Sequence, residues 1–259
     1  MFLHSEALDE INEKLTDINR TFTTIAIVTG FKDFWTSAFP NAEITADTDE
    51  LDLALESYDL VIHAMSLHWS NDPVGQVIQC RRALKPDGVL LVACLGGETL
   101  TELRAAFAEA EVQLTGGLSP RVAPMAQIRE LGAILQRAGL ALPVADRSMR
   151  RVSYENPIAL MHDLRAMGET NAITARNKNF GQRHLFETAA RIYLEAYSDD
   201  AGRILASFEL VFLTGWAPSA AQPQPLRPGS ATTRLADFLQ TTELGEDAKP
   251  VKDERDNQK

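Results

Sequence analysis

Hydrophobic positions along the chain follow two spacings, one typical of surface helices and one of buried strands. In the first twenty residues, apolar side chains recur three or four positions apart with charged ones between them. This spacing predicts an amphipathic helix over 1–20 that lies on the domain. The next apolar run, 24–30, is short, β-branched and ended by Gly30, so it predicts a strand. A helical segment follows it as far as Pro40.

Strands and helices continue to alternate through the middle of the chain. Continuous apolar runs predict buried parallel strands at 58–64 and 89–93. Between them, the pair Asp72-Pro73 can cap a helix and occupy its first position. Further helices are predicted over 99–111 and 125–138. This alternation predicts an α/β fold with a doubly wound, mostly parallel, Rossmann-like sheet.

After Gly139 the pattern changes. Short apolar runs at 140–145 and 149–154 come before two helical patterns, and a long apolar run at 204–216 follows them. The two helical patterns cover 157–167 and 183–197. We therefore expect a C-terminal helical insert before the last strand of the sheet.

The end of the chain has almost nothing to bury. Beyond Phe238 the residues are polar and charged, which predicts a disordered tail over 239–259. Together with the N-terminal helix over 1–20, this leaves one domain over 21–238.

Composition narrows the classes of function. The hydrophobic share of 45% and the charged share of 24% are ordinary for a folded protein. The formal net charge of −11 argues against a nucleic-acid partner held by phosphate attraction. Cys80 and Cys94 are the only cysteines, so neither a disulfide framework nor a metal site is expected. We find no apolar run long enough for a membrane span and no signal-peptide pattern, and we expect a cytoplasmic location.

Several motifs, in a fixed order, resemble those of class I S-adenosylmethionine-dependent methyltransferases. They are Ser57-Tyr-Asp-Leu-Val61, Ser66-Leu-His-Trp69 and Leu84-Lys-Pro-Asp-Gly88, around the fourth and fifth strands of that superfamily. Further motifs resemble a narrower group, the mitochondrial complex I assembly factors that act as protein-arginine hydroxylases, and more distantly the malonyl-acyl-carrier-protein O-methyltransferases. They are Gly96–Arg104, Gly116–Pro120, Met167–Asn171 and Arg227–Ala231. The resemblance covers about 57 to 238 and implies a methyltransferase-like domain over 21–238.

The residues ahead of Tyr58 depart from the family's pattern. Members normally carry an acid and a Gly-x-Gly turn after the first strand, because only glycine lets the backbone approach the cofactor closely. Here Gly30 stands alone. Only 28 residues, Gly30 to Ser57, separate the first strand from the next apolar one, whereas two further strand-helix units need roughly 40 to 50. One strand-helix unit is therefore predicted to be missing, and with it the carboxylate that the resemblance assigns to the cofactor's ribose.

The resemblance also implies which residues face S-adenosylmethionine. Asp47 and Thr48 match the position where the family reads adenine, and His68 and Trp69 lie just past a strand end, where ligands bind in open α/β sheets. The predicted cofactor-binding residues are Gly30, Asp47, Thr48, Ala64, Ser66, His68 and Trp69. Gly96, Gly97 and Glu98 are predicted to form a substrate-side rim. Simpler explanations stay open for several of them: a turn for Gly30, a solvated acidic loop for Asp47 and a helix start for Gly96–Glu98.

No catalytic residue and no metal ligand is assigned from the sequence. His63 lies inside a strand, so we expect a core histidine with a satisfied side chain. His162 and His184 lack a second ligand at a fixed short spacing.

Three functions follow from the resemblance and stay open. The first is a complex I assembly or modification factor that acts on a protein substrate, with a complex I subunit as the expected partner. The second is an active S-adenosylmethionine-dependent O-methyltransferase that acts on an acyl-carrier-bound carboxylate. The third is a non-catalytic scaffold that retains the fold. Whether the protein is an enzyme, and whether it has lost S-adenosylmethionine as a cofactor, stays open with them.

Overall fold

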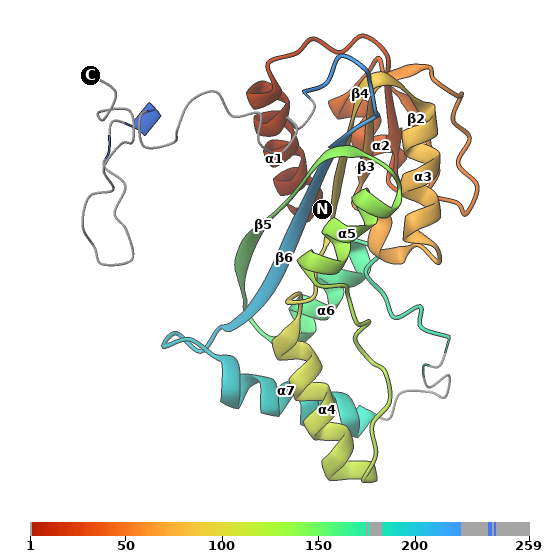
Figure 1. The fold of residues 1–259 in the computed structure, drawn as a ribbon. Helices are drawn as coiled ribbons and strands as arrows, with labels where there is room; N and C mark the ends of the chain where they lie inside the picture. Colours follow the sequence, from red (N-terminus) through yellow and green to blue (C-terminus); the bar gives the residue numbers. More distant parts are fainter. Residues whose placement is uncertain (1, 175, 177–182, 224–237, 240, 242–259) are drawn as a thin grey trace. The chain divides into compact units, whose positions relative to one another are not determined.

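The computed structural model describes residues 2–174, 176, 183–223, 238–239 and 241 (Figure 1). It divides into two units, Met1–Ala220 and Ala221–Lys259. The motif Arg227–Ala231 and all but two residues of the predicted tail, 239–259, lie outside the described residues. The predicted domain boundaries therefore stay a prediction.

Within the described residues, six strands form one sheet in the order β2-β1-β3-β4-β6-β5 (Figure 1). They are β1 (Ile25–Val28), β2 (Glu43–Thr45), β3 (Tyr58–Ala64), β4 (Leu84–Leu95), β5 (Ala141–Tyr154) and β6 (Ile204–Trp216). Strands β1 to β4 are parallel to one another, whereas β6 runs antiparallel to both β4 and β5. The predicted α/β fold with a mostly parallel sheet is confirmed.

Helices cover both faces of the sheet, as a doubly wound fold requires. One hydrophobic core lies under α1 (Phe2–Ile18), α2 (Lys32–Ala38), α4 (Thr101–Thr115), α6 (Pro157–Ala166) and α7 (Arg183–Tyr197). The other lies under α3 (Pro73–Ala83) and α5 (Ile128–Arg137). Neighbouring strand residues such as Leu60 and Val61 belong to opposite cores, because side chains alternate between the faces of a strand. Helices α6 and α7 form the predicted insert before β6.

The region ahead of Tyr58 is short, as predicted. Besides α1 it contains only β1, α2 and β2, and β2 alone lies beyond β1 in the sheet. The strand β2 was not predicted from the apolar pattern, because it is only three residues long. One strand-helix unit fewer than in the family's usual pattern is therefore present.

Three local expectations were wrong. The helix predicted to begin at Met125 starts at Ile128, and the backbone N–H of the residue before it, Gln127, donates to Glu130 Oε2 over 3.0 Å. The helix predicted over 99–111 runs on to Thr115. The runs 140–145 and 149–154 form one strand, because pairing with β6 continues along both.

Candidate functional site

The carboxyl ends of β1, β2, β3 and β4 meet at one edge of the sheet, and the predicted site residues gather there. Gly30 follows β1, and Asp47 and Thr48 follow β2. Ala64 and Ser66 lie at the end of β3, and a short 3-10 helix, η1 (Leu67–Trp69), then holds His68 and Trp69. Three residues follow β4: Gly96, Gly97 and Glu98. Residues far apart in the sequence come together because parallel strands end at the same edge.

Gly30 and Asp47 lie against each other. A Cβ atom placed on Gly30 would lie 3.4 Å from Asp47 Oδ1. Strand β2 is the direct neighbour of β1, so the carboxylate that follows it reaches the turn after β1. The carboxylate of Asp47 therefore lies beside the turn after β1.

Buried polar side chains connect the ends of β2 and β3. His63 Nε2 lies 2.7 Å from Gln76 Oε1, and Gln76 Nε2 donates to the carbonyl oxygen of Thr48 over 3.0 Å. Ser66 Oγ lies 3.4 Å from His63 Nδ1. Burial lowers the pKa of His63 to about 4, so the ring is neutral and donates from Nε2. His63 is a satisfied core histidine, as expected.

A further polar cluster joins η1 to a residue that the sequence did not single out. His68 Nε2 lies 3.1 Å from Glu169 Oε1, and Trp69 Nε1 donates to the same oxygen over 3.4 Å. The side chains of His68 and Glu169 are only 4% and 9% exposed. The backbone N–H of Leu95 donates to His68 Nδ1 over 3.4 Å. Because Nδ1 accepts this bond, we assign a proton to Nε2, which donates it to the carboxylate of Glu169.

The end of α6 brings Glu169 to η1. The N–H of Glu169 donates to the carbonyl oxygen of Leu164, in the last turn of α6. Gly168 has a φ of +79°, and a Cβ atom there would lie 3.0 Å from Phe31 Cζ. Glycine is therefore required both by the backbone angle and by the close approach. Glu169 lies in the motif Met167–Asn171, which is the only sequence signal that could have found it.

A small cavity opens beside this cluster. Its volume is about 70 Å³, and it is lined by Trp69, Glu169, Arg121 and apolar side chains that include Leu103 and Leu164. Ligand pockets usually hold ~300 Å³ or more. The cavity therefore suits the end of a side chain rather than a whole nucleotide cofactor.

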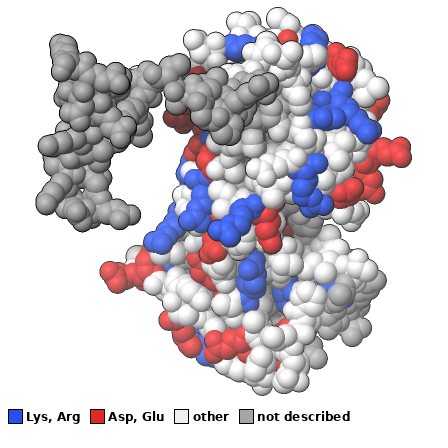
Figure 2. Space-filling model, in the orientation of Figure 1, with Lys and Arg blue, Asp and Glu red and all other residues white. Residues whose placement is uncertain are grey.

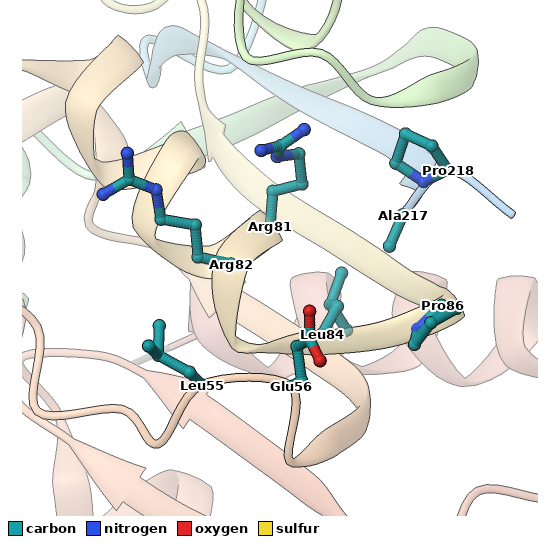
Figure 3. Close-up of a pocket in the computed structure, with 8 residues that line it drawn as sticks. All are labelled: Leu55, Glu56, Arg81, Arg82, Leu84, Pro86, Ala217 and Pro218. Atoms are coloured by element: carbon teal, nitrogen blue, oxygen red, sulfur yellow. The ribbon is translucent and has the colours of Figure 1, made fainter.

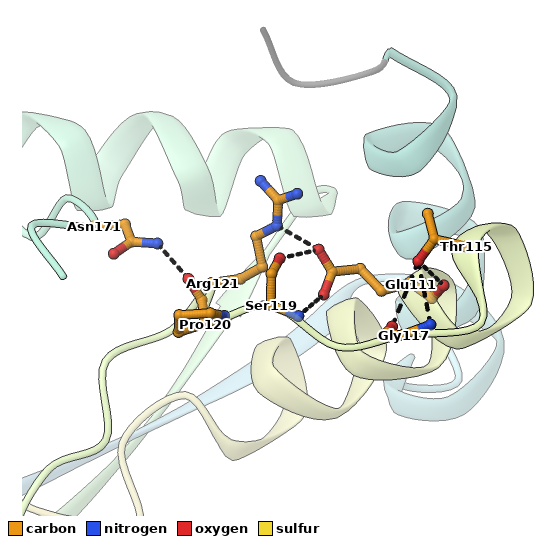
Figure 4. Close-up of polar contacts among 7 residues, drawn as sticks. All are labelled: Glu111, Thr115, Gly117, Ser119, Pro120, Arg121 and Asn171. Carbon is orange, nitrogen blue, oxygen red and sulfur yellow. Dashed lines mark hydrogen bonds and ion pairs between the residues drawn. The ribbon is translucent and has the colours of Figure 1, made fainter. Parts of the chain in front are cut away.

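One wall of the cavity comes from the loop after α4 (Figure 4). Glu111 accepts hydrogen bonds from the N–H of Ser119 over 2.5 Å, from the Ser119 hydroxyl and from Arg121 Nε over 2.8 Å. Burial raises the pKa of Glu111, but these hydrogen bonds outweigh it and hold the pKa below its usual value. Asn171 Nδ2 donates to the carbonyl oxygen of Pro120 over 2.8 Å (Figure 4). The motifs Gly116–Pro120 and Met167–Asn171 are thus in direct contact.

The predicted rim residues differ in exposure. Gly96 and Gly97 are buried, whereas Glu98 is exposed. The N–H of Glu98 donates to Glu209 Oε2 over 2.8 Å, and Glu209 also pairs with Arg147. Nothing in these contacts tests a substrate-side role, which stays a prediction.

A larger cavity, of about 590 Å³, lies at the opposite end of the strands (Figure 3). It is lined by Leu55, Glu56, Arg81, Arg82, Leu84, Pro86, Ala217 and Pro218. Leu84 begins β4, so this cavity faces the amino ends of the parallel strands. Ligands of open α/β sheets bind at the carboxyl ends, so we do not place the cofactor site here despite its volume.

Three further features of the described residues do not change the candidate site: possible metal ligands, apolar helices and surface charge. No group of three or more His, Cys, Asp or Glu side chains is placed there to hold a metal ion. No helix among those residues has the length and apolar character that crossing a membrane requires. On the face shown in Figure 2, basic side chains are interspersed with acidic ones. The expectation of no nucleic-acid partner stays a prediction.

Comparison with known proteins gives the family. The methyltransferase domain family matches residues 8–92. The mitochondrial arginine-hydroxylase NDUFAF5 of Danio rerio is 35% identical over 230 residues, which cover 89% of this chain and 71% of that protein. The NDUFAF5 protein of Dictyostelium discoideum is 39% identical over 191 residues, which cover 73% of this chain and only 44% of that protein.

A second group of relatives is also present. The malonyl-[acyl-carrier protein] O-methyltransferase of Laribacter hongkongensis is 33% identical over 188 residues, which cover 73% of this chain and 61% of that protein. The solved YcgJ protein of Bacillus subtilis has 13% identity and a TM-score of 0.47 over 76% of this chain and 92% of that one, a likeness too low to support an argument. On the identity and coverage of the NDUFAF5 relatives, this chain belongs to the class I methyltransferase superfamily and, within it, to the family of the arginine-hydroxylase NDUFAF5 proteins.

Proposed function

We propose that this protein acts on an arginine side chain of a protein substrate at the carboxyl ends of β3 and β4. The observation that carries the proposal is the cluster of His68, Trp69 and Glu169, which lines a cavity of side-chain size. The NDUFAF5 relatives, named as arginine hydroxylases, support arginine as the target. The partner that we expect is a subunit of respiratory complex I.

The fold and the relatives imply S-adenosylmethionine as the family's cofactor, and we propose that its site is weakened or lost in this chain. A Cβ atom on Gly30 would lie 3.4 Å from Asp47 Oδ1, so the acid lies beside the turn after β1. This turn offers one glycine, and the described residues ahead of Tyr58 form one strand-helix unit fewer than the family's usual pattern. Such a buried polar contact is worth on the order of 1 to 3 kcal/mol. These features support a weakened site, and we derive no reaction step through the cofactor.

Calorimetric titration with S-adenosylmethionine tests the weakened site. We expect a Kd of about 1 mM or weaker, which corresponds to about −4 kcal/mol of binding free energy. A micromolar Kd that is lost in Asp47→Asn and kept in Asp49→Asn would contradict the proposal, because Asp49 is an exposed acid of the same loop.

Mass spectrometry of candidate protein substrates tests the arginine target. We expect an arginine of the substrate to gain one oxygen atom or one methyl group only when this protein is present. Hydroxylation would need an oxidant, and the described residues do not identify a group that holds one, so we assign no chemical step. Gentle crosslinking that recovers no complex I subunit would count against the expected partner.

Two other functions keep specific support. An O-methyltransferase acting on an acyl-carrier-bound carboxylate is favoured by the malonyl relatives. It requires tight cofactor binding, so the titration decides it. A scaffold role is favoured by the shortened N-terminal half, and turnover on any protein substrate would overturn it. The cytoplasmic location stays a prediction, since the NDUFAF5 relatives are named as mitochondrial.

A further inference from the structure

The carboxylate of Glu169 has donors on one of its two oxygens. Its side chain is only 9% exposed. His68 and Trp69 both donate to Oε1. Among the described residues, none donates a hydrogen bond to Oε2. A carboxylate with so little exposure and one oxygen without a donor favours a positively charged partner in the cavity.

The other ionisable groups around the cavity do not supply that charge. Arg121 shares the cavity wall, but it pairs with Glu111, whose side chain is 5% exposed. The charge of Glu169 raises the pKa of His4, but burial outweighs it and lowers that pKa to about 4. His4 also accepts a hydrogen bond at Nδ1 from Trp35 Nε1 over 3.2 Å, as a neutral ring does. His4 is therefore neutral near pH 7.

The cavity itself has the features of a cation site. Glu169 offers an oxygen, and Trp69 lines the same space. Aromatic side chains attract cations that meet the ring face. The cavity volume of about 70 Å³ admits a planar group of a few heavy atoms. Apolar neighbours such as Leu103 and Leu164 would cover the aliphatic stem of a long side chain.

We infer that Glu169 binds the guanidinium group of a substrate arginine, with Trp69 beside it and His68 as the positioning residue that orients the carboxylate. The inference rests on the proposed arginine target and adds the residue that recognises it. A guanidinium can donate two parallel hydrogen bonds to a carboxylate, which favours it over an ammonium group.

Binding of small probes tests this inference without any turnover. The full chain is titrated, by NMR chemical shifts, with Nα-acetyl-arginine methylamide and with its neutral isostere Nα-acetyl-citrulline methylamide. We expect the arginine probe to bind at least tenfold more tightly than the citrulline probe. Glu169→Gln should abolish this preference, whereas Glu13→Gln, which changes an exposed acid of α1 outside the cavity lining, should keep it.

The outcomes separate this inference from the proposed function. Equal affinity of the wild-type chain for the two probes overturns the inference, even if Glu169→Gln fails to fold. A preference that persists in folded Glu169→Gln overturns it too. If arginine in a protein is modified while the probes bind equally, the proposed function stands and the role of Glu169 fails. If the preference depends on Glu169 but no protein arginine is modified, the recognition site stands and the proposed activity fails.

Discussion

Gly96 and Gly97 show how a single residue can be required by packing at the edge of a candidate site. A Cβ atom on Gly96 would lie 2.6 Å from Glu209 Oε2 and 2.7 Å from Val211 Cγ2. A Cβ atom on Gly97 would lie 2.4 Å from Gln127 Nε2. Both positions bring β4 close to neighbouring elements. The packing alone accounts for the two glycines, whatever their role toward a substrate.

The close packing at Gly96 leads to a prediction at the residue scale. Gly96→Ala should lower the free energy of unfolding by about 1 to 3 kcal/mol, because β6 and the buried Glu209 must move. Urea unfolding followed by circular dichroism measures it. Gly117→Ala is the matched control, since no heavy atom lies within 4 Å of its Cβ position. Equal effects of the two substitutions would contradict the packing argument.

Helix α1 shows at the element scale that the N-terminal segment is part of the core rather than an appendage. Leu3, Ala7 and Ile11 are buried in the core under the sheet. On its outer side, Arg150 pairs with Glu6 over 2.6 Å and with Glu10 over 2.8 Å. Such partly exposed ion pairs contribute little to the free energy of unfolding. Burial of the apolar side chains is therefore what mainly holds α1 on the sheet.

Burial of α1 predicts a large effect of truncating its central residue. Ile11→Ala should cost about 2 to 5 kcal/mol of unfolding free energy, because Ile11 is fully buried. The unfolding transition should remain a single cooperative step. Ile158→Ala on α6 is the control, since Ile158 is 46% exposed and should change the free energy little. A small effect at Ile11, or a separate early transition, would show that α1 is only loosely attached.

Two buried neutral histidines make the stability of the whole molecule depend on pH. Burial lowers the pKa of both His4 and His63 from 6.5 to about 4. The unfolded chain therefore takes up protons at a higher pH than the folded one. The stability that they contribute is present above pH 6.5 and is lost as the pH falls from 6.5 toward 4.

This linkage gives a prediction for acid titration of the free energy of unfolding. His63 should account for on the order of 3 kcal/mol of the loss between pH 6.5 and 4, as an upper value. Urea unfolding at a series of pH values should show a shallower slope for His63→Gln than for the wild type. His184→Gln, which changes an exposed histidine on α7, should leave the slope unchanged. Identical slopes for all three proteins would contradict the contribution assigned to His63.

The sequence by itself determined the elements with strong local patterns. The apolar runs 58–64 and 204–216 became β3 and β6 with the expected bounds, and Asp72 caps α3 by accepting the N–H of Gly75. The number of residues ahead of Tyr58 also showed that the N-terminal half is short. Side-chain periodicity and turn chemistry act over a few residues, and chain length can be counted. The sequence alone is therefore enough to reveal these features.

Only the tertiary structure decided how distant parts of the site meet. Glu169 lies about one hundred positions after His68 and Trp69, and the packing of the helical insert brings it to them. The short strand β2 lies beside β1, which brings Asp47 against Gly30, although no apolar pattern predicted it. Such contacts depend on strand order and on how a helix ends, and neither leaves a periodic trace in the residues themselves.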